Sequence, residues 1–121
     1  PDATHAVFAR VARSGARLAT QPPGDLGERM GAAFQAASGP LVLMGTDCPC
    51  LEHRDLRDAA AALTRGATLV LSPAEDGGYG LIAANDHHPT LFRDMPWSTP
   101  GVYRLTLSRA EAAGLNVASL R

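Results

Sequence analysis

LVLMGTDCPCLEHRDL (residues 41–56) joins an apolar run to the start of a helical pattern. Residues 41–44 are apolar without alternation, which is typical of a strand covered on both faces. The run stops at Gly45-Thr46-Asp47, and a helical pattern follows from residue 53. In open α/β sheets, ligands bind beyond the carboxyl ends of the strands. The stretch therefore predicts a buried strand that carries Asp47 at its tip, beside a ligand site.

The flanking sequence continues this alternation of helices and strands. The patterns predict helices over 4–14, 25–38, 53–65 and 100–113, a helical turn over 89–94, and strands over 16–21, 41–44, 67–74, 79–85 and 115–120. We therefore expect a single α/β domain over residues 1–121, with a mainly parallel sheet and helices on both faces.

Two helix starts have specific signals. Asp25 and Glu28 have the spacing of a capping box. Thr99 precedes Pro100, which predicts Thr99 as N-cap and Pro100 as the first helical residue. Trp97, the only tryptophan, is expected to pack at least partly against the domain.

Composition narrows the class of protein. Of 121 residues, 45% are hydrophobic and 19% are charged, as in a globular domain. A net charge of −1 gives no electrostatic argument for nucleic acid or an anionic membrane. We see no apolar run long enough to span a membrane and no signal peptide, and we expect a cytoplasmic protein with Cys48 and Cys50 as reduced thiols.

Acidic residues after two strands could carry chemistry. Asp47 could coordinate Mg²⁺ or Mn²⁺, or it could cap the turn that follows. In PAEDGGYG (residues 73–80), Asp76 could be a metal ligand, a base or a hydrogen-bond acceptor for a hydroxyl group. Gly77 and Gly78 would permit close approach of a ligand, although the same residues suit an ordinary turn between two strands.

Two further stretches could bind a ligand. In QPPGDLGERM (residues 21–30), the helix N-terminus could face an anion and Arg29 could reach a phosphate, but Asp25 could equally be a plain cap. In MPWSTPGVY (residues 95–103), Trp97 could stack on a base or sugar, or could belong to the core.

Together, the stretches GDLGERM, GTDCP, PAEDGGYGLI and WSTPGV resemble the nucleotide-diphospho-sugar transferase superfamily. They are most similar to an uncharacterised bacterial, glycosyltransferase-like branch known as selenodomain-associated transferases, which have the GT-A fold. The resemblance covers about residues 20–120 and implies transfer from a nucleotide-activated donor, glycosyl or nucleotidyl, with Mg²⁺ or Mn²⁺. The chain is not expected to act on nucleic acid.

The resemblance also implies roles for single residues. Asp47 matches the position that holds the metal, and Asp76 is expected to be catalytic. It implies a loop near the nucleotide and an acceptor-side loop, formed by Gly24, Asp25, Leu26, Gly27 and Arg29 and by Gly77, Gly78 and Tyr79. Trp97 is a further substrate-binding candidate, because it could stack on a base or sugar.

The sequence departs from the family pattern at both ends. Relatives begin with a strand and a basic, glycine-containing phosphate loop, and they end with a further acidic segment; neither motif is found in these 121 residues. We therefore expect an incomplete domain that binds nucleotides weakly by itself, and a sheet edge that is covered by another segment or by a homodimer partner. A non-catalytic binding domain and a hydrolase of activated phosphates remain alternatives.

Overall fold

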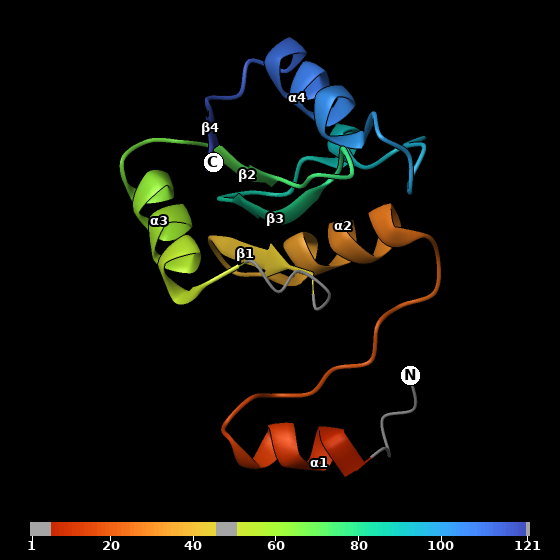
Figure 1. Ribbon diagram of the computed structural model, residues 1–121, viewed down its shortest axis with the longest axis vertical. Coiled ribbons are helices and arrows are strands. Elements are labelled where there is room, and N and C mark those ends of the chain that lie inside the picture. The colour runs from red at the N-terminus through yellow and green to blue at the C-terminus, as the bar shows by residue number, and fades with distance from the viewer. Residues whose placement is uncertain (1–5, 46–50, 121) are drawn as a thin grey trace.

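The fold is built on a sheet of four strands (Figure 1). The computed structural model describes residues 6–45 and 51–120. The strands are β1 (Leu41–Met44), β2 (Leu69–Pro73), β3 (Tyr79–Ala84) and β4 (Val117–Ser119), in the spatial order β1-β3-β2-β4. These four predicted strands are confirmed, with shorter bounds than the patterns indicate for the last three. The prediction that residues 41–44 are buried is wrong, because β1 is an edge strand whose first three residues are half-buried and whose last residue, Met44, is exposed.

The sheet is mixed, so the prediction of a mainly parallel sheet is only partly confirmed. β1, β2 and β4 point the same way, but β3 lies between β1 and β2 and is antiparallel to both. The only parallel neighbours among the described strands are β2 and β4. The reason is local: residues 74–78 form a connection too short for a crossover, so β2 and β3 must form an antiparallel hairpin.

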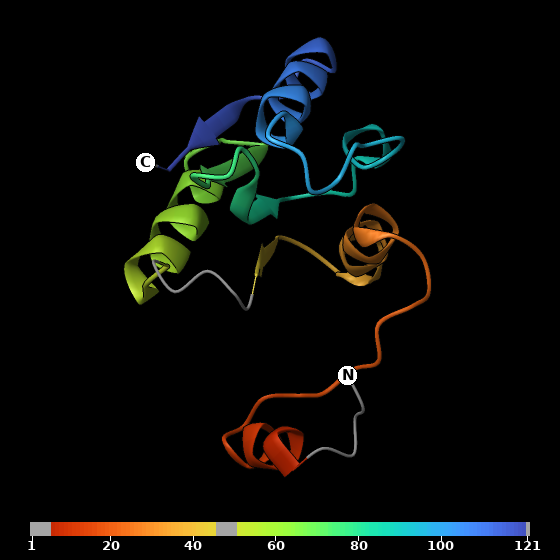
Figure 2. The same cartoon turned by 45° about the vertical axis from the view of Figure 1, so that its right-hand side comes forward.

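Helices cover both faces of the sheet, as predicted. α2 (Leu26–Ala36) and α4 (Val102–Ala112) lie on one face, and α3 (His53–Thr64) lies on the other (Figure 2). Alternation along β2 supplies both cores: Leu69 and Leu71 pack with Phe34 of α2, whereas Val70 packs with Leu63 of α3.

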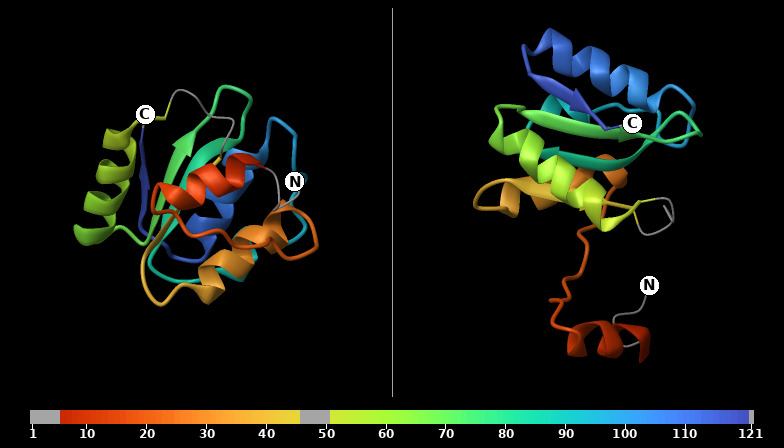
Figure 3. Two further views of the ribbon diagram at one scale, coloured as in Figure 1. Left: turned by 90° about the horizontal axis from the view of Figure 1, so that it is seen from below. Right: turned by 60° about the vertical axis from the view of Figure 1, so that its left-hand side comes forward.

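The N-terminal part differs from its prediction. α1 (Ala6–Arg13) confirms the predicted helix, and it lies away from the sheet, as the right-hand view of Figure 3 shows. The strand predicted over 16–21 is wrong, because these residues are irregular and exposed. A strand needs a ladder partner, and the described strands pair only with one another.

The two predicted helix starts have opposite outcomes. The capping box at α2 is confirmed: Asp25 Oδ1 accepts from Glu28 N at 2.9 Å, and Glu28 Oε1 accepts from Asp25 N at 3.2 Å. The prediction for Thr99 is wrong, because α4 begins at Val102 after Gly101. The Thr99 hydroxyl instead donates to the Pro96 carbonyl at 2.6 Å, closing a turn before the helix.

Candidate functional site

The carboxyl ends of β1, β2 and β4 lie at the same end of the sheet. We call this end of the strands the carboxyl edge. Gly45 follows β1 and donates its N–H to Gly80 O at 3.0 Å, so the tip of β1 lies beside the start of β3. Asp47, the predicted metal ligand, lies outside the described residues. Gly45, the last described residue before it, lies at the same edge as the β2–β3 connection.

Asp76 lies in that connection and is exposed. Its Oδ1 accepts from Gly78 N at 3.0 Å, while Ala74 N donates to Gly78 O at 2.9 Å. The carboxylate therefore closes its own turn through one oxygen. Its other oxygen makes no hydrogen bond within the described part of the chain, and it can accept a proton or a hydrogen bond from a ligand.

Gly77 locks this turn against the segment before α4. Its φ of 91° is in the left-handed region, and a Cβ at this position would lie 2.1 Å from Pro100 O. Tyr103 N donates to Gly77 O at 2.8 Å. Tyr103 is tied in turn to β4, because its hydroxyl and the Ser119 hydroxyl are 2.5 Å apart. Sequence reasoning missed Pro100 and Tyr103 as partners of the turn, since nothing local signals the contact.

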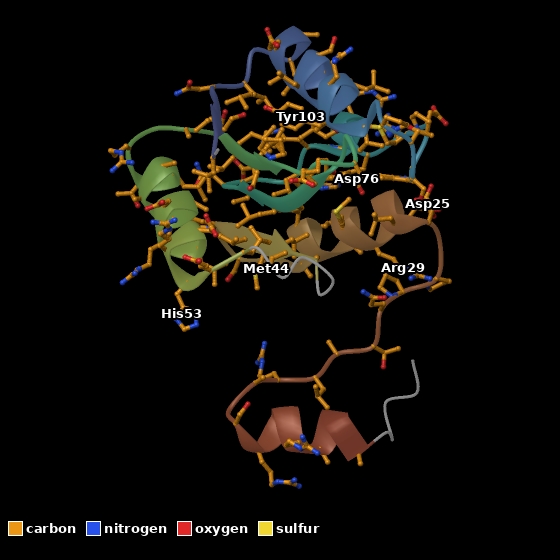
Figure 4. The ribbon with its side chains drawn as sticks, in the orientation of Figure 1. Asp25, Arg29, Met44, His53, Asp76 and Tyr103 are labelled. Atoms are coloured by element: carbon orange, nitrogen blue, oxygen red, sulfur yellow. The ribbon has the colours of Figure 1, made fainter. Side chains whose placement is uncertain are left out.

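The N-terminal turn of α2 reaches the same end of the domain. In Figure 4, Asp25 and Asp76 both lie at this end. A Cβ on Gly27 would lie 2.5 Å from Phe92 O and 2.9 Å from Trp97 Cζ2. Gly27 is thus buried beneath Trp97, and the predicted stretches 24–29 and 95–103 pack together. Trp97 is half-buried against the core, as predicted.

The remaining predicted residues of this turn have different surroundings. Gly24 has a φ of 118°, and a Cβ there would lie 2.7 Å from Glu28 Cδ. Leu26 is half exposed. Arg29 is exposed, and the only hydrogen bond of its side chain in the described part is a weak one from Nη1 to Gln21 Oε1, at 3.4 Å. The guanidinium therefore remains accessible to an anion.

Tyr79 is oriented inward. Burial raises the pKa of the Tyr79 phenol well above its usual value, and an interaction with the Thr106 hydroxyl lowers it by less. The Tyr79 oxygen is inaccessible to solvent. A direct role for this hydroxyl in substrate binding remains a prediction, and in this conformation the ring packs against the core.

The described residues do not by themselves form a metal site. Residues 6–45 and 51–120 contain no cluster of three or more His, Cys, Asp or Glu side chains that could hold a metal ion. In the β2–β3 connection at the carboxyl edge, Glu75 and Asp76 are exposed, and one oxygen of Asp76 is already engaged. The prediction of Mg²⁺ or Mn²⁺ therefore depends on Asp47 and stays a prediction.

Two hollows border this end of the domain. One, of about 460 Å³, runs between α2 and the segment 87–94; we call it the α2 groove. The other, of about 330 Å³, lies between α3 and the end of β4 and is lined by Arg54, Asp55, Asp58, Ser119 and Leu120. No helix in the described ranges is both long and apolar enough to cross a membrane.

A three-layer α/β fold, with loops gathered at the carboxyl edge, defines a class of ligand-binding α/β domains. The chain belongs to the family described as uncharacterized protein conserved in bacteria (DUF2064), whose pattern matches residues 1–99. No curated protein matches the chain.

The chain is also similar to a solved structure from Desulfovibrio desulfuricans G20, a protein provisionally named as a nucleotide-diphospho-sugar transferase. The two are 33% identical, with a TM-score of 0.74. The similarity covers 83% of this chain but 46% of the other chain, so this chain spans about half the length of that protein. The resemblance to the superfamily is confirmed, whereas the selenodomain-associated branch stays a prediction.

Proposed function

We propose that this chain is part of a transferase that uses a nucleotide-activated donor, in glycosyl or nucleotidyl transfer. The observation that carries the proposal is the assembly at one end of the sheet. The tip of β1, the turn around Asp76, the start of α2 and the segment before α4 come from four distant stretches, yet direct contacts join them in pairs. Gly45 meets Gly80, Gly77 meets Pro100, and Gly27 meets Trp97.

Each part has a chemical task in this proposal. Asp76 accepts a hydrogen bond or a proton from the acceptor hydroxyl through its unengaged oxygen. The exposed Arg29 contributes positive charge for the donor phosphates. A divalent cation held by Asp47 would neutralise charge on the phosphates when bound; this element rests on the family resemblance alone. The provisional name of the Desulfovibrio protein supports a nucleotide-sugar donor.

Calorimetric titration tests the proposal. The protein is titrated with nucleoside diphosphate sugars and nucleoside triphosphates, in Mg²⁺, in Mn²⁺ and in chelator, and transfer is followed by nucleotide release. We expect metal-dependent binding whose gain Asp47→Asn largely removes, on the order of a hundredfold for the loss of a carboxylate ligand. Asp76→Asn should lower turnover more than binding.

Asp86→Asn is the matched control. Asp86 is an exposed aspartate just past the end of β3, at the opposite edge of the sheet from Asp76. This variant should behave as the parent protein does. Metal-dependent binding without transfer would favour the alternative, a non-catalytic binding domain. Metal-independent binding that neither Asp47→Asn nor Asp76→Asn changes would overturn the proposal.

A further inference from the structure

β1 is the outermost strand on its side of the sheet. It pairs with β3, and the side of β1 that faces away from β3 has no ladder partner among the described strands; we call it the open side of β1. Outer strands that stay exposed are usually protected by charged residues, proline or a bulge. β1 reads LVLM and contains none of these, so its open side is a ready template for another strand.

The N-terminal arm, residues 6–21, lies beyond the open side of β1. It consists of α1 and the irregular segment that follows α1, and Figure 1 and the right-hand view of Figure 3 both place it on the β1 side of the sheet. The family pattern covers residues 1–99 and therefore includes the arm. The arm is thus part of what the family shares, and a shared segment that lies exposed in one copy needs a surface on which to dock.

The arm and the open side of β1 lack the same kind of partner. Residues 16–21, ARLATQ, have a strand-like pattern but no ladder partner in the single chain. Leu18 in the arm is 46% exposed, and Met44 at the tip of β1 is 50% exposed. Pairing of the two segments would satisfy backbone groups on both and remove apolar surface of both side chains from water.

Charge favours the docking of the arm on the rest of the chain. The arm carries Arg10, Arg13 and Arg17 and no acidic residue, whereas the whole chain has a net charge of −1, so the rest is acidic. Within the described ranges, none of these three guanidinium groups has a carboxylate partner; the ion pair that forms there joins Arg54 and Glu52. The arm is therefore complementary in charge to a surface that it does not contact in its own copy.

We propose that the arm docks on a second copy of this chain. Residues 16–21 of each copy add a strand to the open side of β1 of the other copy, so that two copies form a dimer by reciprocal exchange of their arms. The two contacts are identical and related by a two-fold axis, so the assembly closes at two copies. This inference concerns an interaction surface and does not depend on the proposed transfer.

Sedimentation equilibrium of the whole chain over a range of concentrations tests for the dimer. We expect a dissociation constant of about 1–100 μM, as for a small interface, which weakens as salt rises. Amide exchange at residues 16–21 should slow in the dimer alone. A chain that stays a monomer at about 1 mM would overturn the proposal. Protection of these amides in the monomer would also overturn it, because the arm would then close on its own sheet.

Two substitutions in the arm act through different forces. Leu18→Pro removes a ladder N–H from each arm and should weaken the dimer about a hundredfold or more. Since Leu18 lies outside every helix and strand, the urea midpoint of the monomer should not change. Arg17→Glu should weaken the dimer about threefold to thirtyfold, because both arms change. Arg65→Glu, the same change of charge at the exposed end of α3, is the matched control and should have no effect.

A mixture of two damaged copies distinguishes arm exchange from direct pairing of two β1 strands. Met44→Lys puts a charge on the outer strand and leaves the arm intact. When mixed with Leu18→Pro, one of the two contacts is undamaged and both defects fall on the other contact. Because a lost contact cannot be lost twice, the mixture should dimerise more tightly than either variant alone. A dimer that Leu18→Pro does not weaken, or a mixture no tighter than its components, would overturn the exchange of arms.

Discussion

Replacing Gly77 with alanine should destabilise the domain more than any other glycine-to-alanine change outside the helices. The added Cβ would lie 2.1 Å from the oxygen of Pro100 and 2.5 Å from its Cα, both backbone-anchored atoms that cannot rotate away. The φ of 91° adds a second cost, since alanine in a left-handed conformation loses roughly 1–2 kcal/mol. Displacing the 100–101 segment and weakening the bond from Tyr103 N to Gly77 O should cost about 1 kcal/mol more.

Two other glycines separate the cost of the left-handed conformation from the cost of the contact with Pro100. Gly66 has a φ of 111° but nothing within 4 Å of its added Cβ, so Gly66→Ala measures backbone strain alone. Gly39 has neither a positive φ nor a close neighbour, so Gly39→Ala should leave stability unchanged or raise it by up to about 1 kcal/mol. We expect free-energy losses of about 2–3 kcal/mol for Gly77→Ala and about 1–2 kcal/mol for Gly66→Ala.

Urea unfolding, followed by far-ultraviolet circular dichroism and by fluorescence of the single Trp97, measures all three variants. If Gly77→Ala loses no more stability than Gly66→Ala, the contact with Pro100 contributes nothing. The turn around Asp76 would then not be locked to the start of α4, and the argument for a preassembled site would fail.

Three further predictions follow from single contacts. Asp25→Ala should lower the free energy of unfolding by about 1 kcal/mol in urea unfolding, because the capping box is lost, whereas Asp25→Asn should retain most of it. Arg109→Met should lower the free energy of unfolding by about 1–3 kcal/mol, because three carbonyls of residues 90–94 lose their hydrogen-bond donor. It should also increase amide exchange over residues 90–94, and unchanged exchange would contradict this. Stability should fall as the pH rises above 10.0, the ordinary pKa of tyrosine, because Tyr79 ionises there in the unfolded chain, whereas burial raises the pKa of the folded phenol and keeps it neutral; Tyr79→Phe should reduce this slope in melts between pH 8 and 11.

Local signals predicted the parts of the fold that depend on neighbouring residues. The capping box at Asp25 and Glu28 needs atoms three residues apart, and it forms as the spacing indicates. The apolar run 41–44 and the stripe of α3 gave correct elements for the same reason. Thr99 shows where this reasoning fails: its hydroxyl donates to the Pro96 carbonyl, and the helix begins only after Gly101.

The candidate site was only partly visible in the sequence. The stretches around Asp25, Asp76 and Trp97 were singled out by residue type, and the structure brings them to one end of the domain. The residues that hold this end together were not singled out. Arg109 is an arginine on a helix, and nothing near it in the sequence indicates that it holds the carbonyls of residues 90–94.

The sequence alone determined that this is an α/β domain with helices on both faces, because periodicity and caps are properties of neighbouring residues. It also singled out the stretches around Asp25, Asp76 and Trp97, whose residue types suit a ligand site. Only the tertiary structure decided that β3 inserts antiparallel between β1 and β2, and that Gly77 packs on Pro100 and Gly27 beneath Trp97. These pairings join residues that are far apart in the chain, and their energies depend on distances that exist only once the layers have packed.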